Sequence, residues 1–98
     1  MSMNRNDNLQ GKLVTPAQGA RNLSMRSEFK RGYDEAMKSK PYDYEIPSKR
    51  DAVDYARGRA FAVWTLYNRE KTCRWKNGVL SRAAEERLVR AMYDRAII

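Results

Sequence analysis

The chain has 98 residues, 42% of them hydrophobic, and carries a formal net charge of +8. This length allows one small domain, and no apolar run approaches the roughly 20 residues that a transmembrane helix needs, so we expect a soluble protein without a membrane partner. The first residues lack the apolar stretch of a secretory signal, which predicts a cytoplasmic protein, in the host cytoplasm if the chain is viral.

The N-terminal segment, residues 1–23, is predicted to be a flexible arm. It is rich in Asn, Gln, Gly, Ser and Thr, and Pro16 and Gly19 interrupt any helical period. The arm is either a solvated tail or a segment that orders on a partner. The remaining residues, 24–98, are expected to form a helical domain.

The first predicted helix runs from about Met25 to Lys38 and is stopped by Lys40-Pro41. Ser24 or Ser27 offers a hydroxyl that can cap its first turn. Gly32 lies inside this helix, where glycine costs about 1 kcal/mol relative to alanine, so we expect close packing against another element there. The apolar side chains recur at helical spacing: Met25, Phe29, Tyr33, Ala36 and Met37.

The segment from Pro41 to Pro47 is bounded by prolines and is predicted to be a rigid extended connector. It carries Tyr42 and Tyr44, whose rings are amphipathic. We expect both tyrosines to cover the small core, the alternative being that they stack on nucleic-acid bases.

The second predicted helix opens with Ser48 as its cap and Asp51 three residues later, and it continues to about Asn68. Gly58 and Ala62 allow a neighbouring element to approach closely. We expect this helix to be the central element, buried on two sides. One face carries Val53, Ala56, Ala60, Val63, Trp64 and Tyr67, and most of the opposite face is Asp54, Tyr55, Gly58, Ala62, Thr65 and Leu66.

The segment 72–80 contains Asn77-Gly78, the strongest short turn signal in the chain. It favours a turn with a few hairpin residues, the alternative being an extension of the second helix that ends at Gly78. The last helix is predicted to start after Ser81, with Glu85 and Glu86 in its first turn. The expected fold is therefore all-α, a small three-helix domain with a flexible N-terminal arm and a short hairpin or turn near 73–80.

The sequence predicts a protein that is not an enzyme. It has no histidine, which removes the commonest general base and the commonest metal ligand, and its single cysteine, Cys73, excludes a thiolate zinc site within one chain. The close carboxylate pairs, Asp51 with Asp54 and Glu85 with Glu86, suit helix-dipole or salt-bridge roles better than catalysis. We therefore expect no catalytic residue, no metal site, no cofactor and no small-molecule substrate.

The positive charge is concentrated between Arg57 and Arg82, where seven basic residues face one acid, Glu70. Such a patch favours a polyanion, because it steers association and releases counterions from nucleic acid. We predict nucleic-acid binding, with RNA favoured; the alternatives are a regulatory inhibitor that docks on an acidic groove of a larger host enzyme, such as a polymerase or nuclease, and a passive basic surface. The candidate contact residues are Arg57, Arg59, Arg69, Lys71, Arg74, Trp75, Lys76 and Arg82.

A family resemblance adds to this prediction. The stretch Arg31-Gly32-Tyr33-Asp34-Glu35-Ala36, followed by Pro41-Tyr42, Arg57-Gly58 and Trp64, resembles the ribosome modulation factor family of small basic bacterial proteins. The resemblance implies binding to ribosomal RNA, with Arg31, Tyr33, Tyr42 and Arg57 as RNA-facing or structurally supporting residues. The small size and the tailed architecture also resemble those of a bacteriophage accessory protein.

Overall fold

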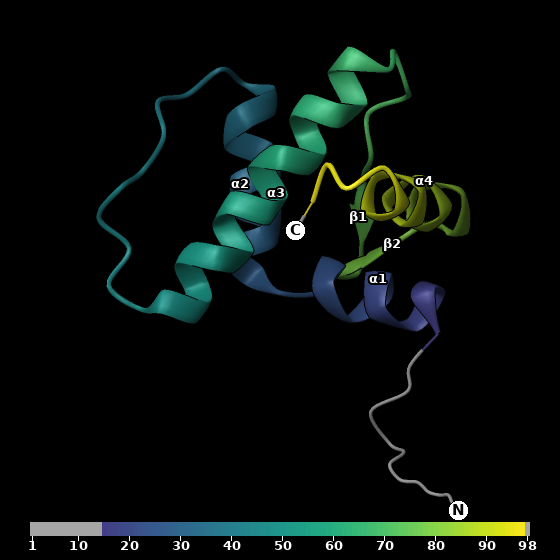
Figure 1. Cartoon of the computed structure of the whole chain (residues 1–98), viewed down its shortest axis with the longest axis horizontal. Coiled ribbons are helices and arrows are strands. Elements are labelled where there is room, and N and C mark those ends of the chain that lie inside the picture. The colour runs from purple at the N-terminus through teal and green to yellow at the C-terminus, as the bar shows by residue number, and fades with distance from the viewer. Residues whose placement is uncertain (1–14, 98) are drawn as a thin grey trace, which may run out of the picture.

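The computed structural model describes residues 15–97, which form four helices and one two-stranded antiparallel hairpin (Figure 1). The elements are α1 (Pro16–Ser24), α2 (Ser27–Met37), α3 (Lys49–Tyr67), β1 (Trp75–Lys76), β2 (Val79–Leu80) and α4 (Arg82–Tyr93). The mostly helical class is confirmed, but this part of the chain has four helices where three were predicted. None of its helices is both long enough and apolar enough to span a bilayer.

The additional helix, α1, lies within the segment predicted to be a flexible arm. That prediction is wrong for residues 16–23, whereas residues 1–14 lie outside the described residues. Pro16 occupies the first helical turn, where its fixed φ suits a helix start, and the Thr15 side chain accepts a hydrogen bond from the Gln18 amide at 3.1 Å. Ala20 is fully buried, which ties α1 to the rest of the domain.

The central packing unit is the pair of helices α2 and α3, which cross at two glycines. A Cβ on Gly32 would lie 3.0 Å from the carbonyl carbon of Tyr55 and closer still to its oxygen. A Cβ on Gly58 would lie 2.8 Å from the carbonyl carbon of Phe29 and 2.9 Å from the Tyr33 nitrogen. Each glycine therefore lets the backbone of the other helix approach, as predicted for both positions.

The hairpin closes the aromatic core from the side opposite α3. The Trp75 ring packs against Phe29 and Tyr33, with centroids 6.4 and 5.3 Å apart, and Phe61 of α3 contacts the same two rings. The indole Nε1 of Trp75 donates to the Ser24 carbonyl at 2.7 Å. Figure 1 shows α2 and α3 on one side of the molecule and α1, the hairpin and α4 on the other. β1 therefore joins the two halves.

Most local signals in the second half of the chain are confirmed. Ser48 and Ser81 cap α3 and α4, and their side chains accept from the amides of Asp51 and Ala84. The favoured hairpin forms, with both residues of Asn77-Gly78 at positive φ, which is the geometry of a type I′ turn. The predicted serine cap of α2 is wrong, since Arg26 takes the N-cap position without a side-chain capping bond.

The prediction that α3 is buried on two sides is also wrong. Its inner face is buried, including Tyr55, Phe61 and Thr65. On the other face Val63 is 60% exposed and Tyr67 is 86% exposed. Trp64, between these two residues, is buried and donates to Asp94 at the end of α4, so α4 covers part of this face and an apolar stripe beside it is left facing solvent.

Candidate anion-binding surface

The basic residues that are clustered in sequence lie at three separate places in the fold. Arg57 lies between α1 and α3, and Arg59 lies beneath the connector. The cations between Arg69 and Arg82 lie on and around the hairpin. The predicted patch of residues 57–82 is therefore not one surface.

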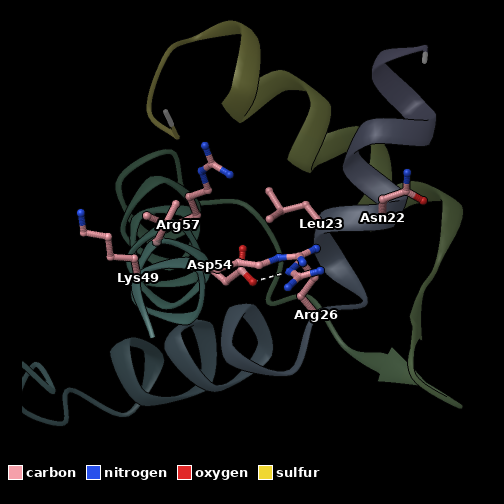
Figure 2. Close-up of a pocket in the computed structure, with 8 residues that line it drawn as sticks. Asn22, Leu23, Arg26, Lys49, Asp54 and Arg57 are labelled. Atoms are coloured by element: carbon pink, nitrogen blue, oxygen red, sulfur yellow. Dashed lines mark hydrogen bonds and ion pairs between the residues drawn. The ribbon is translucent and has the colours of Figure 1, made fainter. Parts of the chain in front are cut away.

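Arg57 lines a cavity of 540 Å³ between α1 and the first half of α3 (Figure 2). The cavity also contains Arg26, which pairs with the buried carboxylate of Asp54 and so joins the start of α2 to α3. Lys49 and Arg50 lie on the first turn of α3 at the same cavity. The charge of Arg26 is thus neutralised by a structural ion pair.

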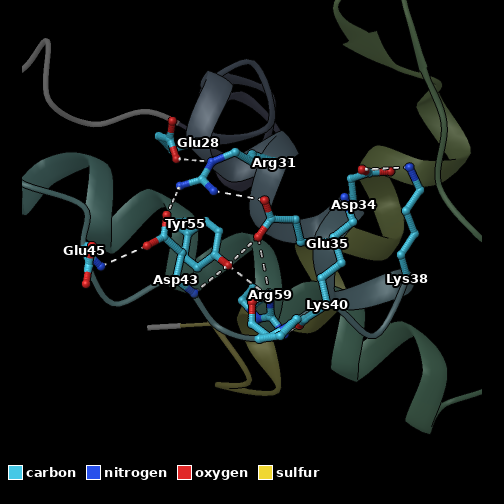
Figure 3. A network of polar contacts seen from close by, with 11 residues as sticks. Glu28, Arg31, Asp34, Glu35, Lys38, Lys40, Asp43, Glu45, Tyr55 and Arg59 are labelled. Atoms are coloured by element: carbon cyan, nitrogen blue, oxygen red, sulfur yellow. Dashed lines mark hydrogen bonds and ion pairs between the residues drawn. The ribbon is translucent and has the colours of Figure 1, made fainter.

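Arg59 belongs to a polar network that fastens the connector to the helices (Figure 3). Its side chain is 16% exposed, and its guanidinium donates to the carbonyl of Lys40 at 2.8 Å and to the Tyr55 hydroxyl at 3.0 Å. Both contacts occupy donors that a phosphate would need. Arg59 therefore supports the fold, which argues against it as a contact residue, and its contact with a partner stays a prediction.

Arg31 is the centre of the same network. Its guanidinium contacts three carboxylates, Glu28 at 2.8 Å, Glu35 at 3.0 Å and Asp43 at 3.1 Å, and it stacks 4.5 Å from the centre of the Tyr55 ring. Because three acids surround it, Arg31 fits the structurally supporting role that the resemblance implies better than the RNA-facing one.

The pKa values of two acids in this network fall below their ordinary values. The pKa of Glu35 is lowered mainly by the hydrogen bond that it accepts from the Tyr55 hydroxyl at 2.7 Å, with Arg31 adding to the effect. The pKa of Asp43 is lowered mainly by the backbone amide of Glu45, which donates to it at 2.9 Å, and then by Arg31. Both carboxylates are therefore held in the charged form.

The tyrosines expected to face RNA or to cover the core have three different environments. Tyr33 is 3% exposed, and its hydroxyl accepts a hydrogen bond from the Cys73 amide at 2.9 Å, so it supports the fold. Burial raises the pKa of Tyr33 to about 12. Tyr42 is partly exposed and packs edge-on against Tyr55, whereas Tyr44 rests on Tyr42 and is largely exposed.

The third place is the hairpin surface, which we define as Lys71, Arg74, Lys76, Arg82 and Arg87 around β1, β2 and the start of α4. Within residues 15–97, none of these five side chains forms an ion pair with an acid. The nearby acids Glu70 and Asp34 are already paired, with Arg90 and Lys38, both at 3.1 Å. The hairpin surface therefore keeps its positive charge available.

Two cavities flank β1 on this surface. One measures 430 Å³ and lies toward α2, where Lys30 and Arg74 line it. The other measures 550 Å³ and lies toward α4, where Arg74, Lys76 and Arg87 line it. Thr72 and Arg74 border both, so they lie on the ridge between the two cavities.

The remaining predicted contacts differ in their accessibility. Arg69 is exposed just beyond the end of α3, at a φ of 55°, and lies before the hairpin surface. Trp75 is half-buried, and its ring and its indole N–H are both engaged with the core. These contacts argue against Trp75 as a base-stacking residue, and its contact with a partner stays a prediction.

Arg87 is a site residue that sequence reasoning missed. It lies in a segment, 83–98, whose charges balance, so the charge count gave no reason to single it out. The helical register does give a signal, because Arg87 follows Ala84 by three positions and precedes Ala91 by four, both of which are buried. A basic residue on that stripe is expected at the edge of the core.

The described residues, 15–97, contain no group of three or more side chains placed to hold a metal ion. Comparison of the chain with protein-family models, with curated protein sequences and with solved structures gives no match.

Proposed function

We propose that the protein is a non-catalytic binding protein that contacts nucleic acid, with RNA favoured, through the hairpin surface. The observation that carries this proposal is the group of cations around the hairpin that make no ion pair with the acids of residues 15–97. Phosphate groups would supply the missing negative charge and would release counterions on binding. The resemblance to the ribosome modulation factor family supports RNA, and ribosomal RNA in particular.

The expected contacts are mainly to the sugar-phosphate backbone. Trp75 is packed into the core, so the hairpin surface offers charge and hydroxyl groups more than free aromatic rings. Backbone contacts position a nucleic acid but do not read its sequence. The protein would therefore select a shape or a compact fold of RNA, and its affinity would depend strongly on salt.

The test replaces Lys71, Arg74, Lys76 and Arg82 together with glutamine. Affinity for a structured RNA is measured at salt concentrations from about 50 to 300 mM, a range over which phosphate contacts weaken measurably. For four lost phosphate contacts, the slope of log affinity against log salt should fall by about 3, since each contact contributes roughly 0.7 to 0.9. Folding should change little, because all four side chains are exposed.

A matched control removes the same charge elsewhere. Lys40, Lys49, Arg50 and Arg95 are also exposed and lie away from the hairpin. The glutamine variant of these four should keep most of the affinity and most of the slope. If both quadruple variants lose affinity equally, binding depends on overall charge, and the hairpin surface is not the site.

The second candidate function is that of a regulatory inhibitor that docks on an acidic groove of a larger host enzyme. The observation that favours it is the exposed apolar stripe of α3, which includes Val63, Leu66 and Tyr67. In a lysate pull-down with and without nuclease, a partner retained after nuclease and lost with Leu66→Asp would support this candidate. A partner lost after nuclease supports nucleic-acid binding.

A further inference from the structure

The cavity between the hairpin and α4 has the composition of an anion site. It measures 550 Å³, which is within the range of about 300 to 1,000 Å³ that ligand cavities occupy. Arg74, Lys76 and Arg87 line it, and none of its lining residues is acidic. Its walls thus carry three positive charges with no carboxylate between them.

Arg87 is the group in this cavity that most clearly lacks a partner. Its Nε is buried and makes no hydrogen bond within the described part of the chain. Its Nη2 lies 3.8 Å from the Cys73 sulfur, which is a weak acceptor. A guanidinium remains charged at any physiological pH, so Arg87 brings to the wall of this cavity a positive charge that no ion pair with an acid of residues 15–97 neutralises.

The start of α4 adds to the positive potential of the cavity. Ser81, the N-cap of this twelve-residue helix, is one of the lining residues, so the positive end of the helix dipole lies at the cavity wall. Thr72, which carries a hydroxyl, also lines the cavity. Donors from three elements therefore converge on one space.

We propose that this cavity binds one phosphate group, with Arg87 as its direct ligand and with Arg74 and Lys76 flanking it. The guanidinium has a planar fork of donors that matches two phosphate oxygens, which a lysine at this position would not reproduce. The site deepens the proposed function, since the phosphate expected there belongs to a bound RNA. Inorganic phosphate shares the same chemistry and serves as a separate probe.

The test follows the Nε–H resonance of Arg87 by NMR in the full-length protein. Inorganic phosphate is added at constant ionic strength, with chloride as the reference anion. Phosphate should shift this resonance saturably together with the amides of Thr72 and Ser81. An unchanged Arg87 resonance in phosphate, with chloride and phosphate giving identical spectra, would overturn the phosphate site.

RNA provides the second arm, with the structured RNA of the salt titration as the probe. Arg87→Gln should weaken binding by about tenfold, since a charge-assisted hydrogen bond is lost, and Arg87→Lys should restore only part of it. Arg82→Gln is the matched control, because Arg82 is exposed one turn earlier on α4 and does not line the cavity. Its effect should be clearly smaller.

The phosphate titration and the RNA-binding measurements together distinguish the proposed phosphate site from the proposed nucleic-acid function. If phosphate binds at Arg87 but RNA does not bind the protein, the cavity stands and the nucleic-acid function fails. If RNA binds the hairpin surface but Arg87→Gln and Arg82→Gln weaken RNA binding equally, the proposed function stands and the proposed phosphate site in the cavity is wrong. Thermal unfolding of each variant checks that the fold is intact. If Arg87→Gln is unstable, the comparison of Arg87→Lys with the wild type takes its place.

Discussion

Replacing Gly58 with alanine should destabilise the protein although alanine is the better helix former. The new Cβ would lie 2.8 Å from the carbonyl carbon of Phe29 and 2.9 Å from the nitrogen of Tyr33. Ordinary contacts between non-bonded heavy atoms are about 3.5 to 4.0 Å. The neighbours are backbone atoms that no side-chain rotation can move, so α2 and α3 must separate by about 1 Å at their crossing.

The size of the effect follows from two opposing terms. Alanine in place of glycine within a helix gains about 1 kcal/mol. Overpacking costs about 1 to 3 kcal/mol or more, and the separation of the helices also loosens the contacts of Phe29, Tyr33 and Phe61. We expect a net loss of about 1 to 2 kcal/mol, which lowers the thermal midpoint by about 5 to 15 °C in a domain of this size.

The assay is thermal unfolding followed by circular dichroism. Ala83→Gly serves as calibration, because Ala83 is exposed on α4 and its replacement reports helix propensity without packing. That variant should lose less than about 1 kcal/mol, because Ala83 lies in the first turn of α4. If Gly58→Ala instead gains a similar amount, the two helices are not in backbone contact at this point, and the crossing described above is wrong.

Three further perturbations test the packing and the polar network. Trp64→Ala should lose about 3 to 5 kcal/mol in urea unfolding, because the ring is buried and its indole N–H donates to Asp94 at 2.9 Å; a loss under 1 kcal/mol would contradict this. Tyr33→Phe should leave the Cys73 amide unpaired at a cost of about 1 to 3 kcal/mol. The pKa of Tyr33 in the folded protein is raised to about 12, so its contribution to the free energy of unfolding is complete below about pH 10 and is lost as the pH rises from about 10 to 12. The phenylalanine variant should therefore lose less stability than the wild type over this alkaline range. Glu35→Gln should reduce the fall in the free energy of unfolding at acid pH, because a carboxylate with a lowered pKa contributes stability above about pH 4 that is lost as the pH falls further. An unchanged acid dependence would show that the network does not stabilise the fold.

The elements with strong local signals were predictable from sequence. Ser48, Asn77-Gly78 and Ser81 mark a helix start, a hairpin turn and a second helix start, and each forms as expected. These signals work because the backbone bonds they satisfy lie within a few residues. The glycines of α2 and α3 were also informative, since a glycine inside a helix needs a packing reason.

α1 was missed because its stability comes from distant contacts. Pro16 and Gly19 resemble helix breakers, yet proline is well placed in a first turn. Ala20 is buried, and Arg21 pairs with Glu85 of α4 at 3.0 Å, a contact 64 residues away in the chain. No pattern within the segment itself indicates such a partner.

The candidate site was only partly predictable for the same reason. The charge count identified the cations of the hairpin, but it could not separate them from Arg59, whose partners Glu35 and Lys40 lie on α2 and just beyond its end. Nor could it show that Trp75 closes the core. Whether a cation is available depends on which acids the fold brings to it.

The most direct test of the hairpin surface as the nucleic-acid contact is an amide NMR titration of the full-length protein with a structured RNA. Lys71, Arg74, Lys76 and Arg82 should show the largest shift changes, and these changes should diminish as salt is raised. The connector of residues 41–47 should stay nearly unchanged. Shift changes confined to the exposed face of α3 around Val63 and Tyr67, or no saturable change at any residue, would contradict the proposed function.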